Sequence, residues 1–373
     1  MAHTYTPGLK VSARHLVRKS RILPLKGTVL VQAGQLVGPD EVVARTELPG
    51  EAKLMNVANL LNVDPSDVPA KMIKHEGDAV QEGELIAAAK SFFGVFKSDA
   101  TAVMTGTVEK INAVTGQVLL RGLSLPVEVK SYVSGKVVEI RENEGCVIET
   151  WASFVQGIFG IGGETNGELM LACESPGQPL TPDLIRPDMA GKVIVGGSRV
   201  TAEALQRAIQ AGVRGVVTGG FDDKDLRDLL GYDLGVAITG TEKLGITLIV
   251  TEGFGDIAMA AKTFDLLKSK VGKLACINGA TQIRAGVIRP EVVIPMDVPV
   301  DTSVDATEHV SALDVGSPVR VIRMPHFGRI GVVSALPPEQ RVLESGSKAR
   351  VLEVDFGGEK VIVPRANVEL IEG

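Results

Sequence analysis

Aromatic residues and cysteines are scarce in this chain of 373 residues, which has 1 Trp, 3 Tyr, 10 Phe and 3 Cys. The cysteines, Cys146, Cys173 and Cys276, are odd in number and form no Cys-x-x-Cys pair. This pattern argues against a disulfide framework and against a cysteine zinc site, and it favours a reducing cytoplasm. The few aromatics also weaken a mechanism based on stacking nucleic-acid bases.

Long apolar runs and the usual catalytic motifs are missing as well. Apolar stretches such as residues 257–261 are far shorter than the roughly 18 residues of a membrane helix, and the N-terminus shows no secretory signal. The 5 His are scattered without His-x-x-x-His spacing, and no Gly-x-Ser-x-Gly or phosphate-loop motif occurs. We therefore expect no membrane span, no catalytic residues, no metal and no cofactor.

Acidic residues are missing from the first 39 residues, although the whole chain carries a net charge of −6. That segment contains six Lys and Arg, so it carries +6 and the rest of the chain −12. Such a basic arm can bind phosphates or an acidic protein surface, including that of a sister subunit, and it can also be a solvated leader. Its candidate contacts with nucleic acid or a partner are Arg14, Arg18, Lys19 and Arg21.

Glycine is plentiful, with 42 residues, in an otherwise ordinary globular composition of 45% hydrophobic and 23% charged residues. In the first half the glycines mark two pairs of internal repeats. Residues 34–44 and 77–87 share Gly-x-x-Val-x-x-[Asp/Gly]-Glu-[Val/Leu]-[Val/Ile]-Ala, and residues 106–118 and 135–147 share Gly-x-Val-x-x-Ile-x-x-x-x-Gly-x-Val. Each copy has the form of a β-hairpin, so the first half is predicted to be a barrel or sandwich of short strands.

Residues 73–118 resemble the barrel-sandwich hybrid, or biotinyl/lipoyl-like, superfamily. The matching residues are Gly77, Asp78, Val80, Gly83, Ile86, Ala87, Gly106 and Val108. The resemblance implies the fold and not a function, because the same module also occurs as a structural insert in large assemblies such as RNA polymerase. A carrier domain of this family modifies a lysine at a tight turn, where this chain has Phe93, so a carrier role is not expected.

A different pattern begins after the proline-rich residues 175–182. The predicted strands are residues 192–195, 215–218, 246–250 and 273–277, and the predicted helices are residues 201–211, 222–230 and about 256–269. Thr201 is a suitable helix cap and Gly212 a suitable stop. Strands that alternate with helices predict a parallel sheet with right-handed crossovers.

Glycine-rich loops follow these predicted strands, so we expect the loops to gather at the carboxyl edge of the sheet, where open α/β sheets bind ligands. Backbone N–H groups at helix starts favour an anion such as phosphate or a nucleotide, whereas glycine also simply makes short turns. The candidate ligand-binding residues are Gly196, Gly197, Ser198, Gly219, Gly220, Glu252, Gly253, Gly255 and Asp256. Residues 248–256 also resemble the start of a toprim domain, but the Asp-x-Asp that toprim metal chemistry needs does not follow residue 277.

The C-terminal residues 316–373 resemble KOW-type SH3-like barrels. The resemblance lies in the alternating residues 319–322, the glycines of residues 327–333 and a Gly357-Gly358 turn. It implies contact with RNA, ribosome or RNA polymerase, and such barrels also serve in packing within larger assemblies. The candidate contacts are Arg320, Arg323, His326 and Arg329.

The chain is thus predicted to be a multi-domain β plus α/β protein. The predicted domains are a basic N-terminal arm at 1–26, a duplicated-hairpin barrel-sandwich-like β domain at 27–180, a small parallel-sheet α/β domain with glycine-rich loops at 181–299, a linker at 300–315 and a KOW/SH3-like barrel at 316–373. We expect a non-enzymatic cytoplasmic scaffold that binds a protein partner or forms a homo-oligomer. The alternatives are a KOW-type factor that binds RNA, ribosome or RNA polymerase, and a nucleotide- or phosphate-binding sensor or enzyme that uses the glycine loops.

Overall fold

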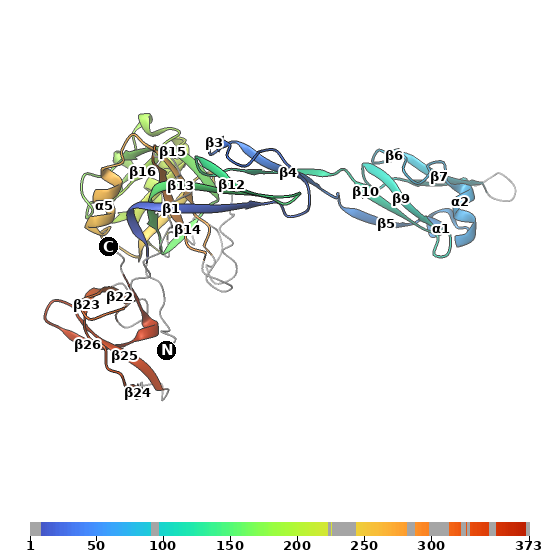
Figure 1. Cartoon of the computed structure of the whole chain (residues 1–373). Helices are drawn as coiled ribbons and strands as arrows, with labels where there is room; N and C mark the ends of the chain where they lie inside the picture. The colour runs from blue at the N-terminus through green and yellow to red at the C-terminus, as the bar shows by residue number, and fades with distance from the viewer. Residues whose placement is uncertain are drawn as a thin grey trace.

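The computed structural model describes residues 9–90, 97–222, 225, 244–281, 288–297, 313–321, 326, 329–342 and 348–370. Their architecture is mostly β and is arranged in several sheets, as predicted. Figure 1 shows a body from which an arm of two successive β modules extends, with a separate C-terminal sheet on another side of the body. No helix among these residues has the length and apolarity that crossing a membrane requires.

The body is built on a 12-stranded sheet with the order β14-β19-β18-β16-β15-β20-β21-β13-β12-β3, to which β1 is added beside β13 and β17 beside β18. Its strands are β1 (Val11–Ile22), β3 (Leu36–Val37), β12 (Gly135–Arg141), β13 (Gly145–Gln156), β14 (Phe159–Ile161), β15 (Glu164–Leu171), β16 (Val193–Val195), β17 (Arg199–Val200), β18 (Gly215–Phe221), β19 (Thr247–Phe254), β20 (Leu274–Asn278) and β21 (Glu291–Pro295). The sheet spans the predicted boundary between residues 180 and 181, since β13 to β15 precede that point and β16 to β21 follow it.

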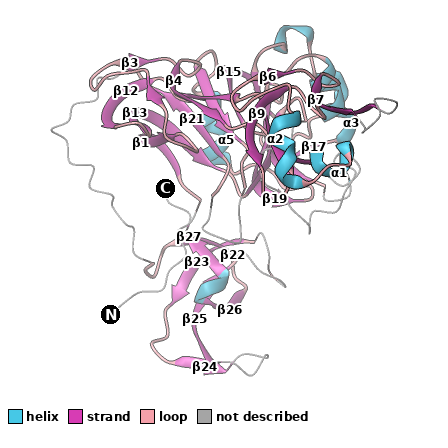
Figure 2. Cartoon of the chain, turned by 90° about the vertical axis from the view of Figure 1, so that its right-hand side faces the viewer, coloured by secondary structure: helices cyan, strands magenta, loops and turns pink. Residues whose placement is uncertain are grey.

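Parallel strands occupy one end of this sheet, as the alternating pattern predicted: β15, β16, β18 and β19 pair in parallel. Helices α3 (Ala202–Gln210) and α5 (Ala261–Lys268) belong to this end (Figure 2). Thr201 caps α3 as predicted, because its hydroxyl accepts a hydrogen bond from the N–H of Ala204 at 3.2 Å. The helix predicted at residues 222–230 lies almost wholly outside the described residues.

Two predictions for this region are wrong. The strand predicted at residues 273–277 is β20, but it pairs antiparallel with both β15 and β21, because it joins the antiparallel half of the sheet. The last helix begins at Ala261 and not near residue 256. Residues 255–260 instead cross the sheet edge in a non-helical path, in which the N–H of Met259 donates to Pro176 O at 3.1 Å.

The arm consists of an inner module (residues 27–50 and 123–149) and an outer module (residues 51–122). The inner module adds β2 (Thr28–Val29), β4 (Val42–Leu48) and β11 (Leu125–Lys130) to β3, β12 and the first part of β13. The outer module contains β5 (Ala52–Asn56), α1 (Val57–Leu61), α2 (Val68–Lys71), β6 (Ala79–Val80), β7 (Leu85–Lys90), β8 (Lys97–Thr101), β9 (Gly106–Asn112) and β10 (Gln117–Gly122). It is inserted between β4 and β11, which pair with each other up to Leu48 and Leu125.

The two modules repeat the same arrangement of strands, which confirms the duplication predicted from the sequence. The second pair of repeats forms the predicted hairpins, β9–β10 and β12–β13. The hairpins predicted for the first pair are wrong, because β3 and β6 pair with β12 and β9 and not with the strands that follow them in the chain. Gly34 and Gly77 take positive φ angles of 86° and 93°. Their N–H groups donate to Val137 O and Val108 O, both at 2.7 Å. At matching positions β3 pairs with β12 and β6 with β9. The glycines are required because few other residues adopt a positive φ at such a turn.

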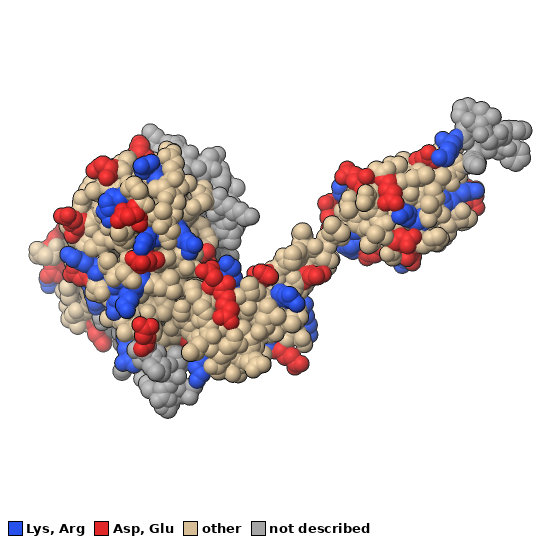
Figure 3. All heavy atoms as spheres, turned by 90° about the horizontal axis from the view of Figure 1, so that it is seen from above, with Lys and Arg blue, Asp and Glu red and all other residues tan. Residues whose placement is uncertain are grey.

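The outer module has a hydrophobic core of its own, formed by residues of that module alone. Leu61, Val68, Ile86, Val108 and Leu120 are among its buried members. Both ends of the module lie side by side, since the N–H of Gly122 donates to Glu51 O at 2.8 Å. In Figure 3 the neck between the modules shows mostly uncharged atoms on the visible face. The arm therefore ends in a self-contained unit on a narrow two-stranded connection.

The C-terminal sheet has six strands in the order β24-β25-β23-β22-β27, with β26 beside β25, and all of its pairs are antiparallel. The strands are β22 (Pro318–Val321), β23 (Ile330–Ala335), β24 (Gln340–Val342), β25 (Lys348–Asp355), β26 (Lys360–Pro364) and β27 (Val368–Leu370). The predicted glycine turn is confirmed: Gly357 and Gly358 have φ angles of 88° and 111°, and their N–H groups donate to Asp355 Oδ1 at 2.9 and 2.6 Å.

Candidate functional site

The structure brings the predicted glycine loops together at one edge of the sheet. Because β16, β18 and β19 run parallel, residues 196–198, which follow β16, lie beside the last residues of β18 and β19. These two strands are longer than predicted, since Gly219 and Gly220 lie within β18, and Glu252 and Gly253 within β19, and not in loops. The N–H of Gly219 donates to Gly197 O at 2.9 Å, and the N–H of Gly220 donates to Ser198 O. A Cβ at any of these three glycines would collide with backbone atoms of a neighbouring loop. Close contact between loops is thus sufficient to explain these glycines, and binding of an anion there stays a prediction.

Two hydroxyl groups at this edge are buried without a hydrogen-bond partner. They belong to Ser198, which is 4% exposed, and to Thr218, which is 0% exposed. A Cβ built on Gly196 would lie 3.3 Å from Thr218 Oγ1. Buried hydroxyls are normally satisfied, so this pair is a place where a polar group of a ligand or a water would be stabilised. Of the remaining predicted residues, Gly253 is buried and Asp256 is exposed.

A buried ion cluster unites one predicted ligand residue with one predicted nucleic-acid contact. Glu252, at the end of β19, binds Arg320 of β22, and the two residues are only 4% and 5% exposed as side chains. Arg320 Nη1 also lies 3.4 Å from an oxygen of Glu369 on β27. The second oxygen of Glu369 accepts from Arg289 Nη1 at 3.2 Å. The cluster therefore joins the C-terminal sheet to the carboxyl edge of the parallel strands.

Both oxygens of the Glu252 carboxylate have a partner. Its other oxygen, Oε1, accepts the N–H of Ala260 at 3.0 Å, just before α5 begins. Arg320 also approaches Thr251 O at 3.4 Å. Burial raises the pKa of Glu369, while the neighbouring Arg289 and Arg320 act in the opposite direction. Neither Glu252 nor Arg320 faces solvent in this arrangement.

Arg289 and Glu369 were not predicted as site residues. Glu369 stands between Val368 and Leu370, which are both buried, and a lone acid in so apolar a strand is the signal that was available. Of the other predicted contacts in this sheet, Arg329 lies 4.1 Å above the ring of Phe356. Arg329 also binds Glu359 at 2.6 Å. His326 lies beside the same ring, and Arg323 is outside the described residues.

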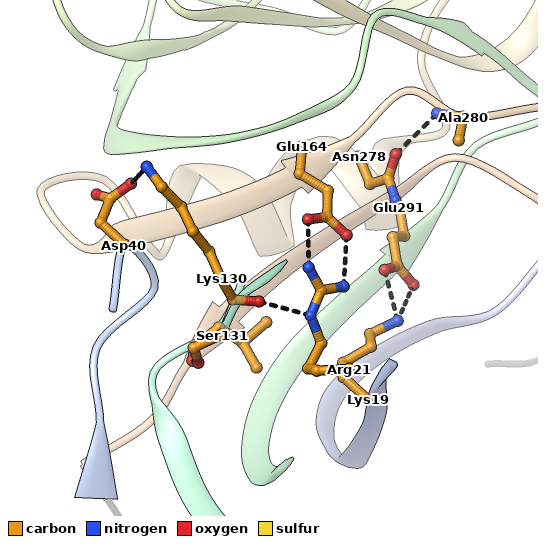
Figure 4. A network of polar contacts seen from close by, with 10 residues as sticks. Lys19, Arg21, Asp40, Lys130, Ser131, Glu164, Asn278, Ala280 and Glu291 are labelled. Atoms are coloured by element: carbon orange, nitrogen blue, oxygen red, sulfur yellow. Dashed lines mark hydrogen bonds and ion pairs between the residues drawn. The ribbon is translucent and has the colours of Figure 1, made fainter. Parts of the chain in front are cut away.

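The basic segment at the N-terminus is not separate from the body, because β1 pairs with β13 along its length. Its side chains bind groups of the same chain. Arg14 lies 4.6 Å above the ring of Trp151, and Arg18 lies 3.2 Å from Glu149. Lys19 binds Glu291 at 2.5 and 2.6 Å, and Arg21 binds Glu164 through two bonds of 2.7 Å (Figure 4). Three of the six positive charges of this segment are thus paired with acids of the same chain.

A charged cleft of about 570 Å³ lies where β1 and the inner module meet the body. Its lining residues are Arg21, Pro39, Asp40, Glu128, Val129, Lys130, Tyr132, Glu164, Thr165, Asn166 and Arg214. Lys130 reaches Asp40 at 3.1 Å, and the carbonyl of Lys130 accepts from Arg21 at 2.7 Å (Figure 4). Bonds from Lys130 and Asn166 lower the pKa of Asp40.

Tyr132 lines this cleft, and its backbone has an unusual conformation. It is 3% exposed and has a φ of 71°, which costs energy for a residue with a bulky side chain. Burial raises its phenol pKa well above the ordinary value, and the nearby carboxylate of Glu291 acts in the same direction. Each acid labelled in Figure 4 is bound to a base. The inner module is joined to the body by two hydrogen bonds, from Arg21 to Lys130 O at 2.7 Å and from Asn166 to Asp40 Oδ2 at 3.1 Å.

An apolar groove of about 560 Å³ lies on the outer module. It is lined by Ala52, Lys53, Leu54, Met55, Asn56, Asn59, Leu60 and Val103. Leu54, Leu60 and Val103 are 60%, 52% and 45% exposed, although leucine and valine are usually buried. This groove was not predicted, because nothing in the residue pattern of β5 distinguishes an edge strand from a central one.

No protein-family model matches the chain, and no curated protein is similar enough to count as a relative. Among the described residues, no group of three His, Cys, Asp or Glu side chains is placed to hold a metal ion.

Proposed function

We propose that this chain is a non-enzymatic, partner-binding or self-assembling scaffold protein, and that the outer module is its binding unit. One observation carries the proposal: a module with its own core lies at the end of an arm and exposes an apolar groove. An exposed apolar groove on a small module is typical of an interaction site. The three free, buried cysteines are in keeping with a reducing cytoplasm.

The finer architecture belongs to the same proposal. We assign the two arm modules to the barrel-sandwich hybrid fold, supported by the repeated glycine turns and their equivalent hydrogen bonds. The position of the carrier lysine in that fold, Phe93 in this chain, lies outside the described residues. We assign the C-terminal sheet to the KOW-type SH3-like fold, supported by its antiparallel order and glycine turn. In this assignment the C-terminal barrel packs against the body through Arg320.

The test is to compare the full chain with a variant that lacks the outer module. Native mass spectrometry and light scattering of protein purified from its own cell would show a partner or an oligomer with the full chain. The variant replaces residues 51–122 with a short Gly-Ser turn, which joins ends that already lie side by side. We expect the variant to fold and to lose the partner or the oligomer. A full chain that is a monomer at every concentration and carries no partner refutes the proposal.

A ligand at the glycine edge is the second candidate, favoured by the unpartnered hydroxyls of Ser198 and Thr218. A phosphorylated ligand bound there raises the melting temperature by mass action. A thermal-shift panel of nucleotides and sugar phosphates tests it, with Ser198→Ala and Thr218→Val as variants that remove the hydroxyls. A flat response across the panel refutes this second function.

A further inference from the structure

The free edge of β5 runs along the apolar groove of the outer module. β5 ends its sheet, because among the described residues it pairs only with β10. Residues 51 and 122 form a hydrogen-bonded pair, since the N–H of Gly122 donates to Glu51 O at 2.8 Å. Hydrogen-bonded pairs alternate along an antiparallel ladder, so the N–H and C=O groups of Ala52 and Leu54 point away from β10. They are available to another strand.

From this geometry we infer that β5 binds an extended segment of a partner protein, in which an acidic residue lies between two apolar residues. The inference rests on the proposed function and names the chemistry of the partner. Addition of a strand to a free sheet edge is a common way to bind peptides: main-chain bonds hold the segment, and alternate side chains give specificity. The exposed side chain of Leu54 supplies the apolar contact for this segment.

The positive charge of Lys53 favours an acidic residue in the bound segment. Lys53 is the one charged residue among those that line the groove. No carboxylate of the described residues pairs with it. In a ladder built on Ala52 and Leu54, Lys53 stands in a non-hydrogen-bonded pair, where opposing side chains are closest. An acid opposite Lys53 is therefore stabilised, and its two apolar neighbours fall on the face of Leu54.

The same charge argues against the most extensive pairing with a second copy of this chain. A symmetric antiparallel pair centred on Lys53 uses the outward groups of both Ala52 and Leu54, and it places Lys53 directly opposite Lys53 of the other copy. Like charges in that position destabilise a sheet pair. A lysine on a free edge also protects a protein from pairing with itself. Lys53 thus disfavours this homodimer and attracts an acidic segment.

The experiment measures binding of a fluorescent peptide to the full chain by anisotropy. The probe has a central glutamate between two valines with threonines outside, and the matched probe has lysine in place of glutamate. We expect the glutamate peptide to bind and the lysine peptide not to bind. Lys53→Glu is expected to reverse this preference. A wild-type chain that binds both peptides equally, or neither, overturns the inference.

A second pair of variants tests the main-chain bonds. Ala52→Pro removes the outward N–H without breaking a bond to β10, whereas Ala52→Val keeps it. Loss of one hydrogen bond predicts binding weaker by about fivefold for Ala52→Pro and unchanged for Ala52→Val. Val114 lies in an exposed turn outside β5, so Val114→Thr is a control substitution that should leave peptide binding unchanged. Equal binding by the two Ala52 variants contradicts the inference.

The outcome separates this inference from the proposed function. If the chain captures its natural partner or forms an oligomer, and Ala52→Pro and Lys53→Glu change neither, the scaffold function stands and the β5 inference fails. If Ala52→Pro abolishes a homodimer seen by sedimentation, the occupant is a second copy and the inference is again wrong. If no partner, oligomer or peptide binding is found, both fail.

Discussion

Removal of the Arg320 guanidinium should weaken the protein more than removal of any exposed arginine. Arg320 is 5% exposed and contacts Glu252 and Glu369, which are 4% and 1% exposed. The substitution Arg320→Met keeps much of the volume and deletes the charge. Glu252 then loses the only cation that pairs with it among the described residues, while Glu369 keeps Arg289. Breaking a buried pair by removing one partner costs about 3 to 5 kcal/mol, because the remaining charge stays buried and unpaired.

This loss is large beside the usual stability of about 5 to 15 kcal/mol, so it is readily measured by urea unfolding monitored with circular dichroism. The matched control is Arg329→Met, because the pair of Arg329 with Glu359 is 38% and 60% exposed and such pairs contribute at most about 1 kcal/mol. Adding Glu252→Gln to Arg320→Met should recover part of the loss, since the uncompensated charge is then gone. A loss for Arg320→Met no greater than that for Arg329→Met refutes the reasoning.

The same variant has a predictable dependence on pH. Burial holds the pKa of Glu369 above its ordinary value of 4.5, and Arg320 opposes this rise. In Arg320→Met the pKa of Glu369 in the folded chain rises further. Below about pH 4.5 this carboxyl is protonated in both the folded and the unfolded chain, so its missing partner no longer affects stability there. The defect should therefore shrink as the pH falls towards 4.5 and grow as it rises. A defect that is constant between pH 4.5 and pH 7 contradicts this explanation.

Three other predictions follow from burial and charge. Burial raises the pKa of Cys173 to about 11 and that of Cys276 to about 12, so a thiol reagent at pH 8 should label them slowly in the native chain and rapidly in denaturant; fast native labelling refutes this. For the same reason, the free energy of unfolding should fall as the pH rises from the ordinary thiol pKa of 9.0 towards the raised pKa values of the folded chain. A fragment of residues 49–124 should unfold cooperatively with about 3 to 5 kcal/mol, and a non-cooperative thermal transition would show that the outer module needs the body. The full chain should show no salt-dependent binding of single-stranded RNA through these arginines, because Arg320 is buried and Arg329 is paired; binding with a steep salt dependence that Arg329→Gln removes would instead support the KOW-factor alternative.

Local features of the chain could be predicted from its sequence, and most of them were. The duplicated turns were visible because Gly34 and Gly77 open the same eleven-residue frame, and hairpin glycines depend on local backbone geometry. Thr201 identified the start of α3 for the same reason, since a helix cap acts within a few residues. These signals are short in range, so one sequence is enough to read them.

Features that depend on distant residues could not be read in the same way. The direction of β20 depends on β15 and β21 beside it, and periodicity along β20 is the same for either direction. Glu252 and Arg320 were both singled out, but as sites for different ligands, because their contact joins positions 68 residues apart. The candidate groove escaped notice because exposure of Leu54 follows from its place at a sheet edge and not from its neighbours in sequence.

The nested position of the outer module separates its surface from the support of the body. Its two ends meet at Gly50 and Gly122, so its removal leaves β4 and β11 as the two strands of one ordinary hairpin. The inner module alone is therefore a complete arm, and the outer module lengthens it without interrupting a strand pair of the inner module. Substitutions on the outer surface can thus change what the arm binds and leave the body intact.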